Sequence, residues 1–557
     1  MEYVKNQILK VTVSDFGKNG EGIGRHEGYT LFVKDAVPGD VVSARLTKVR
    51  KNYAYARCEE VITPSSDRVL PFCEEHIRCG GCQIQALSYE AQLRFKENKV
   101  KNDLIRIGGL SEDAVEAAFE PIIGMDSPVR YRNKSQYPVG YDRDGNIVAG
   151  FYAGRTHSII PCTDCRLCPE ENKDILDIIL SHMRENHIEP YNETTGEGIV
   201  RHILIRKGFA TGQIMVCLVI NKKSGTVNAG SGEYIAAQSE LTDTLSSVPG
   251  MTSVCVSVNN RNTNVIMGDE IHTLWGSDTI KDILLGKTFE ISPLSFYQVN
   301  PVQTEKLYST AIEYAELSGS EEVWDICCGI GTISLCMADK ARTVHGLEIV
   351  PEAIEDAKRN ARCNGTDNAG FICAAAEDFL PKHRGEIKAD VVILDPPRKG
   401  MDEKALDAIC DAAPSRIVYV SCDSATLARD ISFLTARGYV PKRIRCTDMF
   451  CHTIHAECVV LLTQRKPDMS IEITMTEEDL ELTRAEAKAT YKEITDYVQN
   501  KYGLHVPNLY VAQVKREFGI IERENYNKGK EGHHIPQVPP EKREAIIDAL
   551  RFFKMIE

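Results

Sequence analysis

The sequence predicts a multidomain α/β protein built around a largely parallel β-sheet. From about residue 320 onward, short apolar runs alternate with helical stretches, which is the order that produces parallel sheets. Residues 1–62 and about 120–290 are instead rich in β-branched residues separated by turns, a pattern typical of barrels and antiparallel sheets. The chain has 557 residues, of which 43% are hydrophobic, so it is long enough for about three or four domains.

The composition indicates the cellular compartment of the protein and the chemical state of its cysteines. No apolar run is long enough to cross a membrane, and the first ten residues, MEYVKNQILK, carry charges without an apolar core. We therefore expect a cytoplasmic protein whose 19 cysteines stay reduced and serve metal, cluster or catalytic roles. The net charge of −14 means that any contact with nucleic acid must come from local basic patches.

Residues 1–63 are expected to form a small five-stranded barrel of the OB type, because closely spaced strands are joined by glycine turns. Tyr53 and Tyr55 alternate with cations in a segment that has no acidic residue, and the cations are Arg45, Lys48, Arg50, Lys51 and Arg57. This pattern favours an RNA-binding face over an ordinary solvated edge strand. The stretches GKNGEGIGR at 17–25 and VPGDVV at 37–42 resemble the TRAM domain, an OB-like module attached to RNA-modifying enzymes.

Two cysteine-rich segments indicate a metal or cluster site. Cys73, Cys79 and Cys82 are spaced C-x5-C-x2-C, and a fourth ligand is expected among Cys162, Cys165 and Cys168. Four thiolates suit a structural zinc ion or a [4Fe-4S] cluster, and spacing alone leaves both open, together with thiols that bind nothing.

The rest of residues 64–290 is predicted to be a central antiparallel domain. Residues 88–110 read as a helix with one apolar stripe, and we expect it to pack on the α/β domain of residues 291–465. Basic residues recur in the predicted strands and are interpreted as a second RNA surface: Arg130, Arg132, Lys134, Arg155, Arg201, His202 and Arg206.

Residues 323–348 have the layout of a nucleotide-type binding site. The stretch VWDICCGIGTI is an apolar strand, an acid and a glycine turn, and the next strand ends on Glu348, which can accept ribose hydroxyls. The turn lacks G-x-G-x-x-G, so a dinucleotide is disfavoured, and D-x-x-C-G-x-G instead looks like the S-adenosylmethionine site of class I methyltransferases. Glu377 is expected at the end of a third strand and Asp395 at the end of a fourth.

A thiol and a carboxylate follow in positions suited to catalysis. Cys422 ends the buried strand in IVYVSCDS, where it is either a nucleophile or a core residue, and Glu457 precedes an apolar strand after two histidines. Beside a methyl donor, this pair fits methylation of carbon 5 of uracil, because a thiolate adding at carbon 6 activates carbon 5 and a base then removes its proton. The thiol needs a lowered pKa for this role.

In this order, the barrel, C-x5-C-G-G-C, YRNK, FYQVN, DICCGIGT, LDPPRKG, SCD and HAE resemble the iron–sulfur RNA uracil-C5 methyltransferases, especially the bacterial 23S ribosomal RNA enzymes. The resemblance implies a class I, Rossmann-like methyltransferase domain over residues 291–465. It implies a [4Fe-4S] cluster on Cys73, Cys79, Cys82 and Cys165, the last through the pattern H-x-I-[IV]-x4-C. It assigns Cys422 as nucleophile, Glu457 as general base, and six cofactor contacts: Gln298, Cys327, Thr332, Glu348, Glu377 and Asp395.

The sequence departs from these relatives in three places. Asp423-Ser424 replaces the common Asn-Pro, and Cys327 replaces an aromatic residue. Residues 466–557 form a helical extension, with helices expected at 483–501, 507–518 and 540–555, that serves packing or RNA contact. We expect a monomer acting on 23S ribosomal RNA. The alternatives are the same reaction on transfer RNA and an iron–sulfur RNA-binding protein without catalysis.

Overall fold

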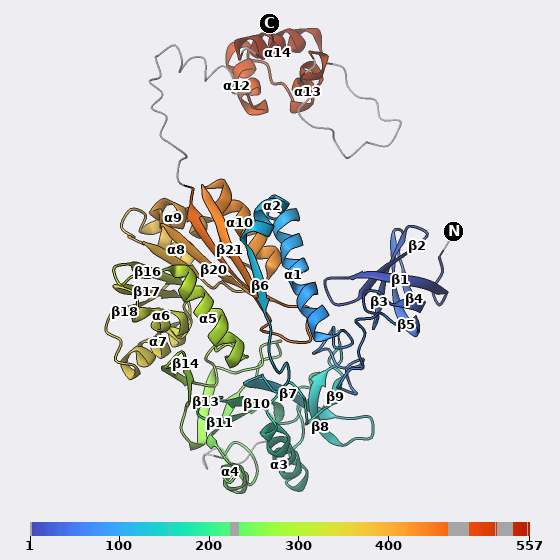
Figure 1. Ribbon diagram of the computed structural model, residues 1–557, viewed down its shortest axis with the longest axis vertical. Coiled ribbons are helices and arrows are strands. Elements are labelled where there is room, and N and C mark those ends of the chain that lie inside the picture. Colours follow the sequence, from blue (N-terminus) through green and yellow to red (C-terminus); the bar gives the residue numbers. More distant parts are fainter. Residues whose placement is uncertain are drawn as a thin grey trace. The chain divides into compact units, whose positions relative to one another are not determined.

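The computed structural model describes residues 3–154, 156–222, 233–465, 489–518, 520, 538–553 and 555–556 (Figure 1). The chain divides into two compact units, residues 1–465 and 466–557. None of the helices in these described ranges is long and apolar enough to cross a membrane.

The predicted N-terminal barrel is confirmed. It is closed in the order β1-β2-β3-β5-β4, and its strands are β1 (Ile8–Phe16), β2 (Gly22–His26), β3 (Tyr29–Lys34), β4 (Val41–Val49) and β5 (Tyr53–Thr63). Alternate residues of each strand point inward, so Val11, Leu31 and Val42 are buried while their neighbours face solvent.

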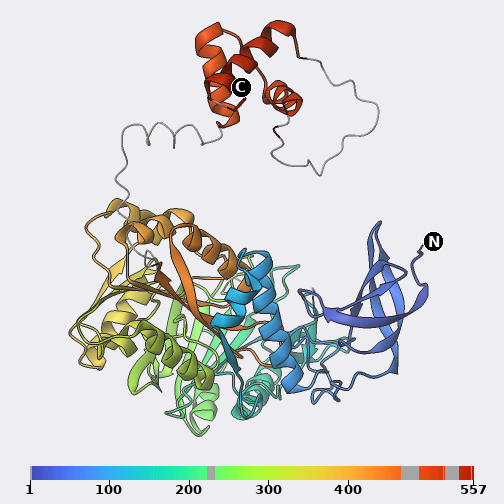
Figure 2. The ribbon, with the colours of Figure 1, turned by 45° about the horizontal axis from the view of Figure 1, so that its top comes forward.

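Helix α1 (Tyr89–Arg106) joins the cysteine-rich segment to the catalytic sheet, and α2 (Glu112–Ala118) follows it (Figure 2). The apolar stripe of α1 buries Val100 and Leu104 in the same cluster as Leu427 and Ile431 of α10 (Ser424–Ala436). The helix is shorter than residues 88–110 because Gly108 and Gly109 follow its last turn.

The central domain contains a seven-stranded sheet in the order β13-β12-β11-β10-β7-β8-β9. The strands are β7 (Lys134–Tyr141), β8 (Ile147–Tyr152), β9 (Ile159–Pro161), β10 (Val200–Lys207), β11 (Ile214–Ile220), β12 (Met251–Val258) and β13 (Glu270–Gly276). Helices α3 (Glu171–Glu185) and α4 (Gln238–Ser246) pack on one face. The expectation of a wholly antiparallel sheet is wrong in one place: β11 and β12 are parallel, because α4 forms the crossover between them.

Two further strand groups join the catalytic part of the unit. β6 (Phe119–Ile123), which the sequence assigned to the central domain, pairs instead with β21 (Tyr439–Thr447) at the edge of the catalytic sheet. The hairpin of β14 (Ile280–Leu284) and β15 (Lys287–Ile291) packs on the core below α5 (Pro301–Ala315).

The catalytic sheet has eight strands in the order β18-β17-β16-β19-β20-β22-β21-β6. Its parallel strands are β16 (Glu322–Ile326), β17 (Thr343–Glu348), β18 (Ala369–Cys373), β19 (Val391–Leu394) and β20 (Arg416–Ser421). The remaining helices around the sheet are α6 (Thr332–Ala338), α7 (Pro351–Cys363), α8 (Ala376–Lys382) and α9 (Glu403–Ala412). β22 (Glu457–Gln464) runs antiparallel beside β20. The start of β22 therefore lies at the same edge as the ends of the parallel strands.

The described residues of the second unit form the helices α12 (Tyr491–Tyr502), α13 (Asn508–Glu517) and α14 (Pro540–Phe552) around a small apolar core. The first begins at Tyr491 because Thr490 and Glu493 form a capping box there. The earlier part of the predicted helix at 483–501 lies outside the described residues up to residue 488.

Candidate active site

The proposed nucleophile and base lie on neighbouring strands. Ser421 of β20 pairs with Cys458 of β22, so Cys422 follows one strand at the position where Glu457 begins the other. The adjacency follows from strand direction, because the end of β20 meets the start of an antiparallel neighbour.

The turn after Cys422 accommodates its departure from the relatives. Asp423 is the N-cap of α10, and its carboxylate accepts hydrogen bonds from the backbone N–H groups of Ala425 and Thr426 at 3.1 and 3.0 Å. The Ser424 hydroxyl donates to Asp103 of α1 at 2.5 Å and accepts from Lys99 at 2.5 Å. Asp423 thus caps α10, and Ser424 fastens the turn after Cys422 to α1.

The environment of Cys422 differs from the sequence expectation. Burial raises the pKa of the Cys422 thiol to about 11, and the nearby carboxylates of Glu457 and Asp395 add to this, while Arg398 opposes them. The protein alone therefore keeps this thiol protonated, and the lowered pKa that catalysis needs must come from positive charge brought by the ligands.

Glu457 has the environment of a proton acceptor poised near neutral pH. Its side chain is buried, and burial followed by repulsion from Asp395 raises its pKa to about 8. Its Oε2 atom has no hydrogen-bond partner among the described residues. A buried carboxylate oxygen without a partner is costly for folding, which points to a role in binding or chemistry.

Arg398 is a residue of this site that sequence reasoning missed. It is exposed, and its charge lowers the pKa of both Cys422 and Glu457. The sequence signal that could have identified it is its place in LDPPRKG, three residues after Asp395. Burial raises the pKa of Asp395 itself to about 7.

The glycine turn after β16 forms the other half of the site. Cys327, Gly329 and Gly331 have φ values of 68°, 55° and 81°, in the left-handed region that glycine tolerates best. The Gly329 N–H donates to Glu348 Oε2 at 3.1 Å, so the carboxylate at the end of β17 fixes the conformation of the turn. Cys327 is the strained member of this turn, since it has a Cβ atom.

The predicted cofactor contacts gather around this turn. The charges of Glu348, Asp395, Asp325 and Glu377 all act on the Cys327 thiol, whose pKa is raised to about 12, chiefly by burial. The prediction that Glu377 ends a strand is wrong: β18 ends at Cys373, and Glu377 lies in the first turn of α8. It reaches the site because that turn follows the strand at the same sheet edge.

Thr332 and Gln298 complete the set from two other elements. Thr332 begins α6, and its hydroxyl is 3.2 Å from the Tyr308 hydroxyl of α5. Gln298 is buried, and its backbone carbonyl accepts a hydrogen bond from Asn133 at 2.8 Å. Phe296, two residues earlier, is 64% exposed, so an aromatic ring stands free beside the site.

The loop before Glu457 is held by the cysteine-rich segment. The His452 carbonyl accepts hydrogen bonds from the N–H groups of Gln83 and Ile84 at 3.1 and 3.2 Å, and its ring bridges Gln92 and Pro128. Lys96 of α1 forms a fully buried ion pair with Asp448. The position of Glu457 therefore depends on residues near the cysteines.

The two cysteine-rich segments lie together, as the ligand prediction requires. Burial raises the pKa of the Cys162 thiol to about 12, and its next largest influences are Cys73 and Cys79. Cys79 also interacts with Cys168, while Cys82 packs in one apolar cluster with Cys165. All three C-terminal cysteines thus approach the first segment.

In the part of the chain that the structure describes, no group of three or more His, Cys, Asp or Glu side chains is arranged to hold a metal ion. A [4Fe-4S] cluster places four irons between its thiolates, so its ligands lie farther apart than those of one ion. Cys168 accepts a hydrogen bond from Ser135 at 3.0 Å, which occupies it in local packing. The converging thiols are a donor set that fits a cluster.

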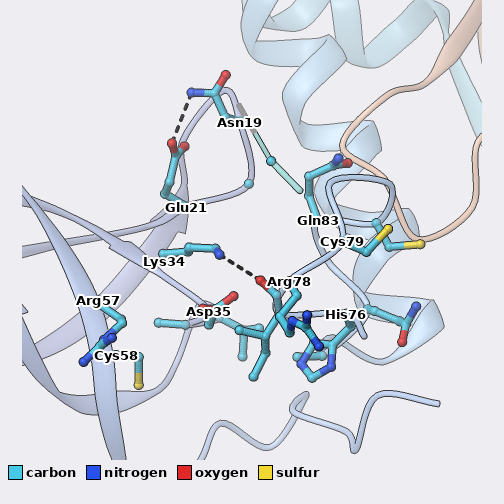
Figure 3. Close-up of a pocket in the computed structure, with 18 of the residues that line it drawn as sticks. Asn19, Glu21, Lys34, Asp35, Arg57, Cys58, His76, Arg78, Cys79 and Gln83 are labelled. Atoms are coloured by element: carbon cyan, nitrogen blue, oxygen red, sulfur yellow. Dashed lines mark hydrogen bonds between the residues drawn. The ribbon is translucent and has the colours of Figure 1, made fainter. Parts of the chain in front are cut away.

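A cleft of about 620 Å³ separates the barrel from this segment (Figure 3). Its walls carry Lys34 and Asp35 on the barrel side and His76, Cys79 and Cys82 on the other. The ammonium group of Lys34 spans the cleft and donates to the Ile77 carbonyl at 2.8 Å.

The first predicted RNA surface is partly free for ligands. Arg45 and Arg57 are paired with Glu59, whereas Lys48, Arg50 and Lys51 have no ion pair among the described residues. Tyr53 and Tyr55 pack edge to face beside Phe32.

The second predicted RNA surface is largely wrong. Arg201 and Arg206 donate to backbone carbonyls, Arg130 binds the carbonyls of Cys165 and Cys168, and His202 is buried. These side chains serve packing, because buried cations need acceptors. Arg155 lies outside the described residues. Arg132 and Lys134 keep side chains without a hydrogen bond or ion pair in the described structure.

Comparisons with known proteins agree with this site. The tRNA (Uracil-5-)-methyltransferase family model matches residues 286–465, and the TRAM domain model matches residues 4–58. The chain is 44% identical over 460 residues to an uncharacterized RNA methyltransferase of Listeria innocua, covering 82% of this chain and 98% of the relative. It is 43% identical to one of Clostridium tetani, covering 82% and 97%.

A solved structure is similar across the same extent. The crystal structure of Pyrococcus abyssi tRNA (uracil-54, C5)-methyltransferase in complex with S-adenosyl-L-homocysteine matches with a TM-score of 0.63 and 26% identity, covering 82% of this chain and all of that chain. These matches set aside the alternative of an RNA-binding protein without catalysis. The chain belongs to the tRNA (uracil-5-)-methyltransferase family and is an RNA methyltransferase that uses S-adenosylmethionine, with an N-terminal TRAM domain.

Proposed function

We propose that this protein methylates carbon 5 of a specific uridine in 23S ribosomal RNA through a covalent adduct between Cys422 and carbon 6 of the base. The observation that carries the proposal is the β20–β22 pairing, which puts a thiol and a buried carboxylate with a free oxygen side by side. The methyl donor supplies an electrophilic methyl group on a positively charged sulfur.

The chain's own residues account for the remaining steps. The Cys422 thiolate forms the bond to carbon 6, and the electron pair of the C5=C6 bond moves toward the O4 carbonyl, which makes carbon 5 nucleophilic. After carbon 5 takes the methyl group, the Glu457 carboxylate removes the carbon 5 proton, the double bond re-forms, and the thiolate leaves. The pKa of Glu457, raised to about 8, makes it a stronger base than an exposed carboxylate.

The cofactor would be held by the six residues around the glycine turn: Gln298, Cys327, Thr332, Glu348, Glu377 and Asp395. Glu348 is suited to ribose hydroxyls because it ends the second strand of the nucleotide-binding unit. Cys327 offers less surface than an aromatic ring, so its contribution to binding the cofactor is expected to be small.

We further propose that Cys73, Cys79, Cys82 and Cys165 hold a [4Fe-4S] cluster. Bound there, the cluster would link the two cysteine-rich segments covalently through its irons. The test is the visible spectrum and iron content of anaerobically purified protein. A colourless protein that contains zinc would contradict this assignment.

The adduct is tested with two variants and unmodified RNA. Cys422→Ala should form no covalent enzyme–RNA complex on a denaturing gel. Glu457→Gln should accumulate one, because the proton on carbon 5, whose removal allows the thiolate to leave, stays in place. Normal turnover by either variant would contradict the role assigned to that residue. Cys458→Ala, which changes the thiol beside Glu457, is a control that should turn over.

Transfer RNA is the second candidate substrate, and the similar Pyrococcus abyssi enzyme, which acts on uracil 54 of tRNA, favours it. The resemblance of the cysteine-containing motif set to the bacterial ribosomal enzymes favours 23S ribosomal RNA. Mass-spectrometric mapping of 5-methyluridine in both RNA pools from a deletion strain decides between them. Loss of the modification from transfer RNA alone would refute the ribosomal assignment.

A further inference from the structure

A group of cations on the central sheet, made of Arg132, Lys134 and Arg206, has no anionic partner among the described residues. Lys134 begins β7 and lies opposite Arg206 of β10 in the strand register. The charged groups that act on Lys134 are Arg206 and Arg132, both cations, and no carboxylate is among them. Three positive charges that converge in partly desolvated surroundings repel one another. The arrangement would be stabilised by an anion, which the described residues do not supply there.

The alternation of side chains along β7 and β10 determines which face of the sheet these cations occupy. Ser135 and Tyr137 face α3, where both accept hydrogen bonds from Asn172. Side chains alternate along a strand, so Lys134 lies on the opposite face. Arg206 is on that face too, because its neighbour Ile205 packs in the core under α3.

That face meets the segment that leads into the active site. The Arg206 guanidinium donates to the carbonyls of Pro293 and Ser295, at 3.3 and 2.5 Å. Asn133, between Arg132 and Lys134, donates to the carbonyls of Gln298 and Val299 at 2.8 and 2.9 Å. The cations therefore lie beside the segment that carries the exposed Phe296 and the predicted cofactor contact Gln298.

The three cations differ in how free they are. The carbonyls of Pro293 and Ser295 hold Arg206, which is 3% exposed. Lys134 is partly exposed, and neither it nor Arg132 makes a side-chain hydrogen bond or ion pair among the described residues. Arg132 also acts on the thiols of Cys82 and Cys168, so it lies near the cysteines as well as near Lys134.

We propose that Lys134, with Arg132 beside it, binds a phosphate group of the RNA backbone next to the uridine that enters the active site. A phosphate is the anion that an RNA substrate brings to every nucleotide, and Lys is a common partner for it. The proposal rests on the proposed function in one respect, the RNA substrate, and does not depend on which RNA it is. The carboxylate of S-adenosylmethionine is the other anion that reaches the site, and the experiment separates the two.

The experiment measures RNA affinity against salt concentration with the full chain and S-adenosylhomocysteine. Wild type, Lys134→Met and Lys134→Arg are compared on total ribosomal RNA and total transfer RNA between about 50 and 200 mM salt. On the RNA that wild type methylates, Lys134→Met should bind more weakly, and the slope of log K against log[salt] should fall by about 1, the loss of one phosphate contact. Lys134→Arg should keep the wild-type slope.

The matched control is Lys173→Met on α3, which packs on the other face of the same sheet and should leave the slope unchanged. Calorimetry with S-adenosylmethionine should give the same affinity for wild type and Lys134→Met. An unchanged salt slope on both RNAs would overturn the proposal, and so would a loss of S-adenosylmethionine affinity. The adduct assay with Cys422→Ala and Glu457→Gln tests the proposed function separately.

Discussion

Lys134→Met should stabilise the protein while it weakens RNA binding. Burial, and then repulsion from Arg206 and Arg132, lowers the pKa of Lys134 from 10.5 to about 8. Each pKa unit corresponds to about 1.4 kcal/mol, so the charged Lys134 side chain lowers the stability of the folded protein by about 3 kcal/mol at neutral pH. Methionine keeps the length of the side chain and removes the charge. Because Lys134 keeps some contact with water, we expect a gain of about 2 kcal/mol.

The pH dependence identifies the cause. Between pH 8 and 10.5 the folded protein binds fewer protons at Lys134 than the unfolded chain, so this contribution to stability rises with pH. The penalty is fully present below pH 8, is about 1 kcal/mol at pH 10, and vanishes above about 10.5. The advantage of Lys134→Met over wild type should shrink accordingly.

Urea unfolding of both proteins at pH 7 and pH 10 measures this effect, with Lys173→Met as the control. Lys173 is exposed and, among the described residues, pairs with Asp177 at i,i+4, so its substitution should leave stability nearly unchanged. A Lys134→Met variant that is no more stable than wild type at pH 7 would refute the reasoning. An equal gain at both pH values would show that the charge is not the cause.

Three other predictions test the site and its support. The rate at which Cys422 is alkylated in the protein alone, followed by peptide mass mapping, should be low at pH 7 and rise about tenfold per pH unit toward about pH 11, because only the thiolate reacts. A fast reaction at pH 7 would contradict the raised pKa. Lys96→Met should destabilise the protein by about 3–5 kcal/mol in urea unfolding, because it leaves Asp448 charged and buried, and a loss below about 1 kcal/mol would argue against an ionised pair. Cys165→Ser should lose iron and visible absorbance whereas Cys162→Ser keeps both, and the reverse pattern would move the fourth ligand.

Local patterns in the sequence determined the helices and strands and most of the residues assigned to the reaction. The alternation in β1 and its neighbours predicted the barrel, since period-two burial is a property of the strand itself. The apolar run before Cys422 and the glycine turn after Asp325 predicted strand ends that carry functional groups, because motif and strand are continuous in the chain.

Contacts between distant segments were decided only by the tertiary structure. No local signal shows that β6 leaves the central domain to pair with β21, or that β22 inserts beside β20 and brings Glu457 to Cys422. The environment of each cation was equally hidden, since Arg206 and Lys134 look alike in the sequence. Only packing gives Arg206 its carbonyl acceptors and leaves Lys134 without a hydrogen bond or ion pair in the described part of the chain. Burial and pKa depend on everything that surrounds a group in space, and a linear pattern records only what is adjacent along the chain.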